Sequence, residues 1–451
     1  MAPGRRRHRR GGDERAPKTK TSSRKKEATA AGPATSVHDI PDHVLELIFL
    51  RLDSCASVVR AASACTRWCL LLAGSAFASR FGSLPLLAGH YHTVHNFFDR
   101  SLAASRATPV FVPSPGMAGV DPRHFSLDFL PDSTSWELAD SRGGLLLLFK
   151  KSTAQASWSW TGYRYLPDQL VVCEPSTRRH QGILSPPYLQ GKCIGLFLLH
   201  GDGDDVSGGR RIGMSNFRIL AVLHEFKPWV YGRIGPVACA FSSGCDGGWR
   251  VLPESAAAFD GDAAVPDRVE QISFTGRVGG SAYWAIGQEH GASMLVLDVA
   301  TAAFSVVTFP DHLVRSHDRH NFRVISGDYG GLRVVRLLDN ELKVFGRRHG
   351  SDEWVLQNHI RLPEATRGLP GHEDRFFRQN EAIIVAAEET HVVVTPQEKT
   401  WPFSVDLETM EVERALERNK YAGTAFAYEL PWPPAVLMTC AERGRSRRTR
   451  R

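Results

Sequence analysis

Three closely spaced histidines, His90, His92 and His95, are the clearest candidates for chemistry in this sequence. Imidazole nitrogens bind transition metals, and alternate residues of an extended chain point to the same side. The segment reads as a connector after a helical region, however, and no neighbouring residue that would orient the rings can be identified. We therefore expect no metal site here and no cofactor in the chain.

An acidic run is the second candidate. Asp202, Asp204 and Asp205 resemble the start of a calcium-binding loop, but no glutamate stands where the twelfth-position ligand is required. The sequence also contains no G-x-S-x-G, P-loop or H-E-x-x-H pattern. These observations predict no catalytic residues, and a protein that is not an enzyme.

Composition favours an all-β body. The 451 residues include 40 glycines and 26 prolines, which is typical of many short strands joined by tight turns. No apolar run is long enough for a membrane helix, so we expect a soluble protein without membrane partners. The eight cysteines form no C-x-x-C pair and are expected to be free thiols in a reducing compartment.

The positive charge lies in the two ends of the chain. Residues 1–36 carry eleven basic and three acidic residues, and residues 443–451 carry six arginines. Since the whole chain is +7, residues 37–442 carry a net charge of −7. We expect disordered basic tails at 1–36 and 442–451, nucleic-acid binding only weakly through those tails, and, without a secretory signal, a location in the nucleus or cytoplasm.

Residues 37–82 have a helical pattern that differs from the rest. We expect helices from Pro41 to Leu52, over 56–64 and over 65–73, followed by a short helix that pairs Phe77 with Phe81. A unit of about 45 residues is too small to bury all these apolar side chains internally. The surplus must be covered either by another protein or by the rest of this chain, and composition alone does not decide between them.

The same residues resemble the F-box motif, in the form common in plant F-box proteins. The resemblance rests on Ile40-Pro41-Asp42, on Leu47-Ile48-x-x-Arg51-Leu52, and on the run from Ser57 to Trp68. In that family the motif binds a Skp-type adaptor and, through it, a cullin scaffold. Carried over residue by residue, the resemblance implies an adaptor-binding set of Ile40, Pro41, Val44, Ile48, Leu52, Val58, Val59, Arg60, Cys65 and Trp68.

Internal repeats predict the architecture of the large carboxy-terminal part. Paired glycines precede strand-like runs at 143–144, 279–280 and 330–331, and a polar turn recurs at 174–177, 298–301 and 406–409. Asn216-Phe-Arg is echoed by Asn321-Phe-Arg 105 residues later, and Asp298 is followed by Asp406 after 108 residues. Pro253, Pro310 and Pro363 are 57 and 53 residues apart, so these spacings fit a unit of about 53 residues counted once or twice. Four-stranded units of this length are typical of a β-propeller, with about six blades here. Trp249, Trp284 and Trp354 are expected to fill the space between blades.

This part also resembles the kelch-like associated region of plant F-box proteins, notably at 140–145 and 174–179. The expected fold class is therefore a multidomain α+β protein: an F-box module at 37–82, a connector and first strands at 83–135, and an all-β kelch-like propeller at 136–441. The function that the resemblance implies is substrate recognition in a Skp-cullin-F-box ubiquitin ligase, in which the propeller captures an unknown protein target. The alternative is a propeller enzyme or scaffold whose helical module only packs or dimerises.

Overall fold

The computed structural model describes residues 37–52, 55–72, 77, 86–92, 109–114, 117, 121–132, 136–150, 164–185, 192–200, 212–224, 236–244, 248–252, 272–286, 292–310, 321–327, 331–347, 353–379, 382–396, 401–414 and 425–430. Within these ranges no helix has both the length and the apolar composition needed to cross a membrane. The predicted tails, His95 and the acidic run from Asp202 to Asp205 lie outside them.

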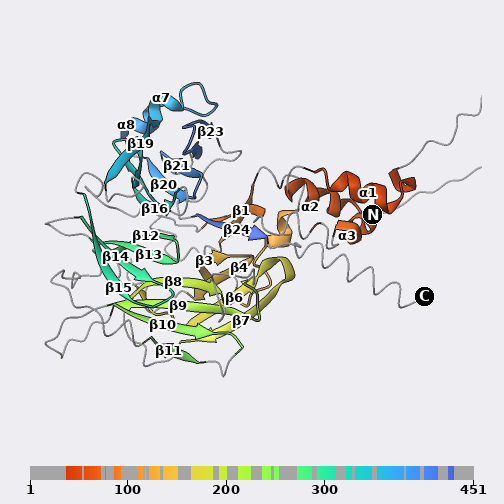
Figure 1. Cartoon of the computed structure of the whole chain (residues 1–451), viewed down its shortest axis with the longest axis horizontal. Coiled ribbons are helices and arrows are strands. Elements are labelled where there is room, and N and C mark those ends of the chain that lie inside the picture. The colour runs from red at the N-terminus through yellow and green to blue at the C-terminus, as the bar shows by residue number, and fades with distance from the viewer. Residues whose placement is uncertain are drawn as a thin grey trace, which may run out of the picture.

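The described strands form six antiparallel sheets (Figure 1). The first complete sheet has the order β3 (Trp136–Arg142), β4 (Leu145–Lys150), β6 (Gln169–Glu174) and β7 (Arg179–Leu184). The second has the order β5 (Arg164–Tyr165), β8 (Lys192–His200), β9 (Phe217–His224), β10 (Pro236–Ser242) and β11 (Trp249–Val251). The third has the order β12 (Ile272–Val278), β13 (Ser281–Ile286), β14 (Ala292–Asp298) and β15 (Phe304–Phe309).

The remaining sheets complete the series. The fourth has the order β16 (Phe322–Ser326), β17 (Leu332–Leu338), β18 (Glu341–Arg347) and β19 (Trp354–Arg361). The fifth has the order β20 (Ile383–Ala387), β21 (His391–Thr395), β22 (Phe403–Asp406) and β23 (Val412–Arg414). The sixth, which we call the closing blade, has the order β24 (Ala425–Leu430), β1 (Leu86–His92) and β2 (Val110–Pro113).

One strand of each sheet lies on a central ring. Strands β3, β8, β12, β16, β20 and β24 contact one another in this order, and β24 contacts β3 again. Because each sheet packs against its two neighbours and the series closes, the molecule is a six-bladed β-propeller. This confirms the predicted propeller and its blade number.

The ring is closed by pairing the two ends of the propeller sequence. Strand β24 pairs antiparallel with β1, so that Leu86 faces Leu430 and His92 faces Ala425. The sequence predicts Phe403 to Leu407 and Ala435 to Cys440 as late strands that would close the ring by pairing within 86–130. Phe403–Asp406 instead pairs inside its own blade with β21 and β23, and residues 435–440 lie outside the described residues. A late strand does pair within 86–130, but it is Ala425–Leu430, which neither candidate includes.

Paired glycines form the hairpin between the first two strands of a blade. Gly143 and Gly144 have φ of 56° and 86°, and Gly279 and Gly280 have φ of 56° and 82°. Two consecutive positive φ values are the geometry of a type I′ turn, whose twist matches that of the flanking strands. Asp339 and Asn340, with φ of 52° and 59°, form such a turn between β17 and β18 without glycine. Gly330 lies outside the described residues.

The recurrent polar turn joins the third and fourth strands of its blade. In two of its three copies an aspartate carboxylate caps the turn: Asp298 Oδ1 accepts from Thr301 N at 2.8 Å, and Asp406 Oδ1 accepts from Thr409 N at 2.8 Å.

The similarity between Asn216-Phe-Arg and Asn321-Phe-Arg does not mark a structural repeat. Phe217 begins β9, the second strand of its blade, whereas Phe322 begins β16, the innermost strand of another.

The predicted role of the tryptophans is confirmed. Trp284 is fully buried, and its indole Nε1 donates to the Ile194 carbonyl of the neighbouring blade at 2.8 Å. Trp249 donates across blades to the Leu184 carbonyl at 3.1 Å. Trp354 packs against Phe309 of the preceding blade, with ring centroids 5.0 Å apart. Each ring therefore fills space between two sheets, and each of the two indole N–H groups named finds a carbonyl there.

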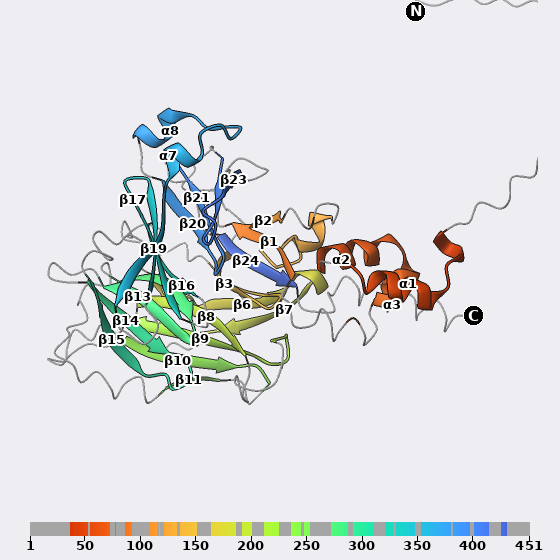
Figure 2. The ribbon, with the colours of Figure 1, turned by 45° about the horizontal axis from the view of Figure 1, so that its top comes forward.

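Three helices precede the propeller and lie beside the closing blade (Figure 2). They are α1 (Asp42–Phe49), α2 (Cys55–Ala64) and α3 (Thr66–Leu72), preceded by the short 3₁₀ helix η1 (Val37–Asp39). Helix α1 starts one residue later than predicted, because Pro41 has extended backbone and occupies the N-cap. Phe77 is helical and buried, and the rest of the predicted fourth helix is outside the described residues.

The described part of the chain contains four more short helical segments. They are η4 (Pro122–Phe125) next to β2, η6 (Pro175–Thr177) between β6 and β7, and α7 (Leu362–Ala365) and α8 (Asp374–Gln379) after β19. The buried side chains of α1 to α3 belong to the same apolar core as Tyr91 and Tyr428 of the closing blade and Phe125 of η4. The helical module therefore shares its core with the propeller at the point of ring closure.

Candidate functional site

Helix α1 has a buried and an exposed apolar face. Leu45 and Phe49 are one turn apart and buried, whereas Leu47 and Ile48 leave 62% and 47% of their surface exposed. On α3, Leu70 is 40% exposed although the adjacent Cys69 is buried. The module thus keeps large aliphatic side chains in water after its own core is complete, and burying them would favour binding to a partner.

Contacts between α1 and α3 set the angle between the two exposed faces. The Arg67 guanidinium of α3 donates to the Asp42 carboxylate through Nε at 2.8 Å and also donates to the Ile40 carbonyl. Phe49 and Trp68 pack edge to face, with ring centroids 5.0 Å apart. The half-buried Trp68 is therefore part of the internal packing of the module as well as a predicted contact residue.

The ten residues of the predicted adaptor-binding set differ in accessibility. Pro41, Ile48 and Arg60 are exposed, and Ile40, Val44, Leu52, Cys65 and Trp68 are half-buried. Val58 and Val59 are fully buried in the core of the module. The assignment of these two valines to a contact surface is therefore corrected: they position α2 and offer no surface to another protein.

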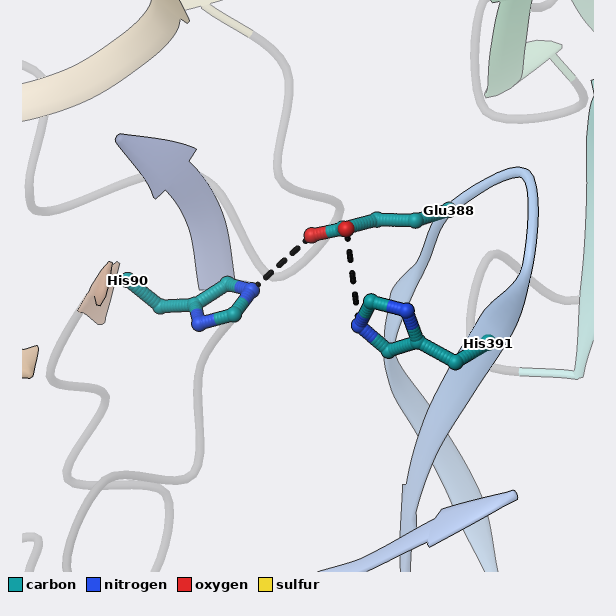
Figure 3. Close-up of side chains that lie close together, drawn as sticks. All are labelled: His90, Glu388 and His391. Atoms are coloured by element: carbon teal, nitrogen blue, oxygen red, sulfur yellow. Dashed lines mark hydrogen bonds and ion pairs between the residues drawn. The ribbon is translucent and has the colours of Figure 1, made fainter. Parts of the chain in front are cut away.

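A second cluster joins the closing blade to the fifth blade (Figure 3). His90 lies on β1, which is a propeller strand and not a connector, and its Nε2 is 2.9 Å from Glu388 Oε1. The other carboxylate oxygen of Glu388 is 3.4 Å from His391 Nε2. Glu388 and His391 flank the turn between β20 and β21, where Glu388 N donates to the His391 carbonyl at 2.9 Å. Sequence reasoning missed this cluster, because no local pattern connects residue 90 with residue 388.

The surroundings of this cluster shift the protonation of its neighbours. Burial raises the pKa of Glu388, but the hydrogen bond from His90 and the charges of His391 and His90 outweigh it, so that the pKa lies below its ordinary value. Burial, together with the negative charge of Glu388, raises the pKa of Glu429 on β24. Burial also lowers the pKa of His92 to about 4. Glu388 is thus held ionised between two histidines while the neighbouring groups tend to the neutral form.

A largely buried carboxylate, that of Asp140, lies on the inner ring of strands. Asp140 on β3 is 9% exposed, and its Oδ2 accepts from Leu198 N of β8 at 2.7 Å and from Arg277 Nη1 of β12 at 3.2 Å. Arg277 Nη1 also donates to the Leu198 carbonyl at 3.2 Å. The carboxylate and these two partners come from three consecutive blades, so the contacts of Asp140 connect the blades of the inner ring.

The cysteines for which the structure describes a side-chain environment are free thiols: Cys65, Cys69, Cys173, Cys193 and Cys239. Burial, with a smaller contribution from Glu174, raises the pKa of Cys173 well above its ordinary value. A buried thiol with a raised pKa is a poor nucleophile, because the thiolate is the reactive form. Cys173 therefore belongs to the core and is not a candidate for catalysis.

Comparison with known proteins does not identify a family. No family model matches the sequence, and no curated protein matches it. Among solved structures, apo AztD from Citrobacter koseri is 14% identical, with 72% of this chain and 66% of that chain covered and a TM-score of 0.28.

Two other solved structures are similarly distant. A protein from Lactobacillus plantarum is 8% identical, with 74% and 83% of the two chains covered and a TM-score of 0.34. A putative TolB from Agrobacterium tumefaciens is 11% identical, with 66% and 90% covered and a TM-score of 0.30. Similarity at this level carries no argument about function, and the propeller is defined by the sheets of this chain.

Proposed function

We propose that this protein is a substrate-recognition subunit of a Skp-cullin-F-box ubiquitin ligase. The helices α1 to α3 dock on a Skp-type adaptor, which links the chain to a cullin, and the propeller holds a protein target for ubiquitination. The chain contributes binding surfaces, while the chemistry belongs to the other subunits. The proposal starts from the F-box resemblance of residues 40–68, and the accessible apolar side chains of the helical module support it.

The single observation that carries the proposal is the exposure of Leu47, Ile48 and Leu70. These side chains lie on the two helices that Arg67 and the Phe49–Trp68 pair hold together. Burying these aliphatic side chains in an interface would remove apolar surface from water, which favours association. Ile48 also belongs to the set that the resemblance assigns to the adaptor.

The alternative, a scaffold whose helical module only packs internally, has its own supporting observation. The buried residues of α1 to α3 share one apolar core with the closing blade. Internal packing accounts for Leu45, Phe49, Val58 and Val59, but it leaves the exposed side chains of α1 and α3 unexplained. The two functions are therefore distinguished by those exposed side chains.

The test is co-purification of a Skp-type adaptor with the full chain and with the triple variant Leu47→Ala, Ile48→Ala, Leu70→Ala. We expect the triple variant to lose at least tenfold in adaptor affinity, at an unchanged melting temperature. The matched control replaces three exposed aliphatic residues of the propeller, Leu184→Ala, Val251→Ala and Val307→Ala, and should bind as the wild type does. Equal adaptor binding by the wild type and the helical variant would rule out docking through this surface.

A further inference from the structure

The cluster of His90, Glu388 and His391 has the composition of a transition-metal site. Two imidazoles and one carboxylate converge from β1 and from the β20–β21 turn, as Figure 3 shows. One ligand atom from each residue lies within 4.8 Å of the other two. Sets of two histidines and one glutamate bind zinc through three protein ligands and leave one coordination position open.

The distances inside the cluster fit a bound ion. In a tetrahedral zinc site with bonds of about 2.0–2.1 Å, neighbouring ligand atoms are about 3.3 Å apart. The carboxylate oxygens of Glu388 lie 2.9 Å from His90 Nε2 and 3.4 Å from His391 Nε2. The carboxylate of Glu388 is thus already at about ligand-to-ligand distance from both imidazole nitrogens.

The second nitrogen of one histidine is already oriented. His391 Nδ1 is 3.3 Å from the hydroxyl of Thr390, which leaves Nε2 toward Glu388. Histidine ligands of metals commonly have the other ring nitrogen fixed in this way by a hydrogen-bonding group. The side chains of His90, Glu388 and His391 are 17%, 27% and 26% exposed, so an ion can reach the cluster from solvent.

We propose that His90, Glu388 and His391 bind one divalent transition-metal ion of the zinc class. Hard cations such as calcium and magnesium are disfavoured, because they require mostly oxygen ligands and two of these three ligands are nitrogens. The ion joins β1 of the closing blade to the turn of the fifth blade, and thus fastens the ring next to its closing strand. This proposal is independent of the proposed ligase function.

The test is a titration of the full chain, without a histidine tag and after removal of metal by a chelator, with zinc chloride in a calorimeter. We expect one equivalent of zinc to bind and saturating zinc to raise the melting temperature by about 2 °C or more, because the site exists only in the folded ring. The variants Glu388→Gln and His391→Gln should each weaken this binding at least tenfold and abolish the shift in melting temperature. Cobalt should give the visible absorption bands of a low-coordinate site in the wild type and lose them in both variants.

The matched control is His359→Gln, which removes an exposed histidine of β19 in another blade and should leave binding unchanged. Circular dichroism of each metal-free variant establishes that it is folded before it is titrated. The proposal is overturned if the wild type takes up no zinc below about 100 µM. It is equally overturned if folded Glu388→Gln and His391→Gln variants bind zinc like the wild type, since the ion would then be held elsewhere.

Discussion

Tyr91 and Tyr428 pack edge to face across the closing strand pair, with ring centroids 5.3 Å apart. One residue comes from the first strand of the propeller sequence and the other from the last, and both are fully buried. The Tyr91 hydroxyl donates to the Phe125 carbonyl at 2.6 Å, and the Tyr428 hydroxyl donates to the Gly144 carbonyl at 3.1 Å. Closure of the ring therefore rests on an aromatic pair whose polar ends are both satisfied.

The first prediction is that Tyr428→Ala destabilises the protein by about 3–5 kcal/mol, the usual cost of removing a fully buried aromatic ring. The measurement is the free energy of unfolding in urea. Deletion of residues 425–451 should have at least as large an effect, because it removes the innermost strand of the closing blade. A deletion variant as resistant to urea and to limited proteolysis as the full chain would show that β24 is dispensable for the ring.

Local turn chemistry made much of this fold predictable. Gly143-Gly144 and Gly279-Gly280 mark hairpins because only a positive φ at both positions fits the turn, and Asp298 and Asp406 mark turns because each carboxylate caps its own backbone. Such signals lie within a few residues of one another, so a sequence displays them directly. The 108 residues between Asp298 and Asp406, together with the proline spacings, predicted the unit length and from it the blade number.

The closing strand and the histidine cluster could not be predicted in this way. Ala425–Leu430 contains two alanines and a glutamate, and it is less apolar than the run at 435–440 that the sequence suggested instead. Its partner is β1, at the other end of the propeller sequence, so no turn between them reveals the pairing. The same separation places His90 beside Glu388 without any local trace. The Asn-Phe-Arg similarity misled because strands share the same apolar and β-branched residue types wherever they lie in a blade. The same short run therefore begins β9, a second strand, and β16, an innermost strand.

The second prediction concerns alkaline pH. Burial raises the pKa of Tyr91 and Tyr428 above the ordinary 10.0 and that of Cys173 above the ordinary 9.0. In the unfolded chain these groups lose protons at their ordinary values, while in the folded protein they keep them. The unfolded state therefore binds fewer protons, and the free energy of unfolding should fall as pH rises above about 9.

Tyr428→Phe provides the control for this pH dependence. At pH 7 the variant should be less stable by about 1 kcal/mol, because it loses the hydrogen bond to the Gly144 carbonyl. Above pH 10 the difference should shrink, since phenylalanine has no proton to lose in the unfolded state. Urea unfolding of both proteins between pH 7 and 11 measures this, and a difference that stays constant over the whole range would contradict the assignment to Tyr428.

The third prediction concerns the ion pair of the inner ring. Asp140→Ala should cost about 2–4 kcal/mol, because it leaves the partly buried Arg277 guanidinium without its carboxylate and the Leu198 amide without its acceptor. Arg277→Ala alone should cost less, because Asp140 still accepts from Leu198 N and Ser141 N. A double-mutant cycle in urea should give a coupling energy of about 1 kcal/mol or more. Additive effects of the two substitutions would show that the pair does not act as a unit.

The last prediction tests how tightly adjacent blades approach at the ring. A Cβ atom at Gly276, on the innermost strand β12, would lie 1.9 Å from the Val324 carbonyl oxygen of β16. Because that neighbour is backbone in the next blade, the clash can be relieved only by moving one sheet relative to the other. Gly276→Ala should therefore destabilise the protein by about 1–3 kcal/mol, as overpacking of a core does.

Gly182→Ala is the matched control, because Gly182 is an exposed strand residue at which an added Cβ would meet nothing within 4 Å. It should change the free energy of unfolding by no more than about 0.5 kcal/mol. If the two variants unfold at the same urea concentration, the blades are not in close contact at this point.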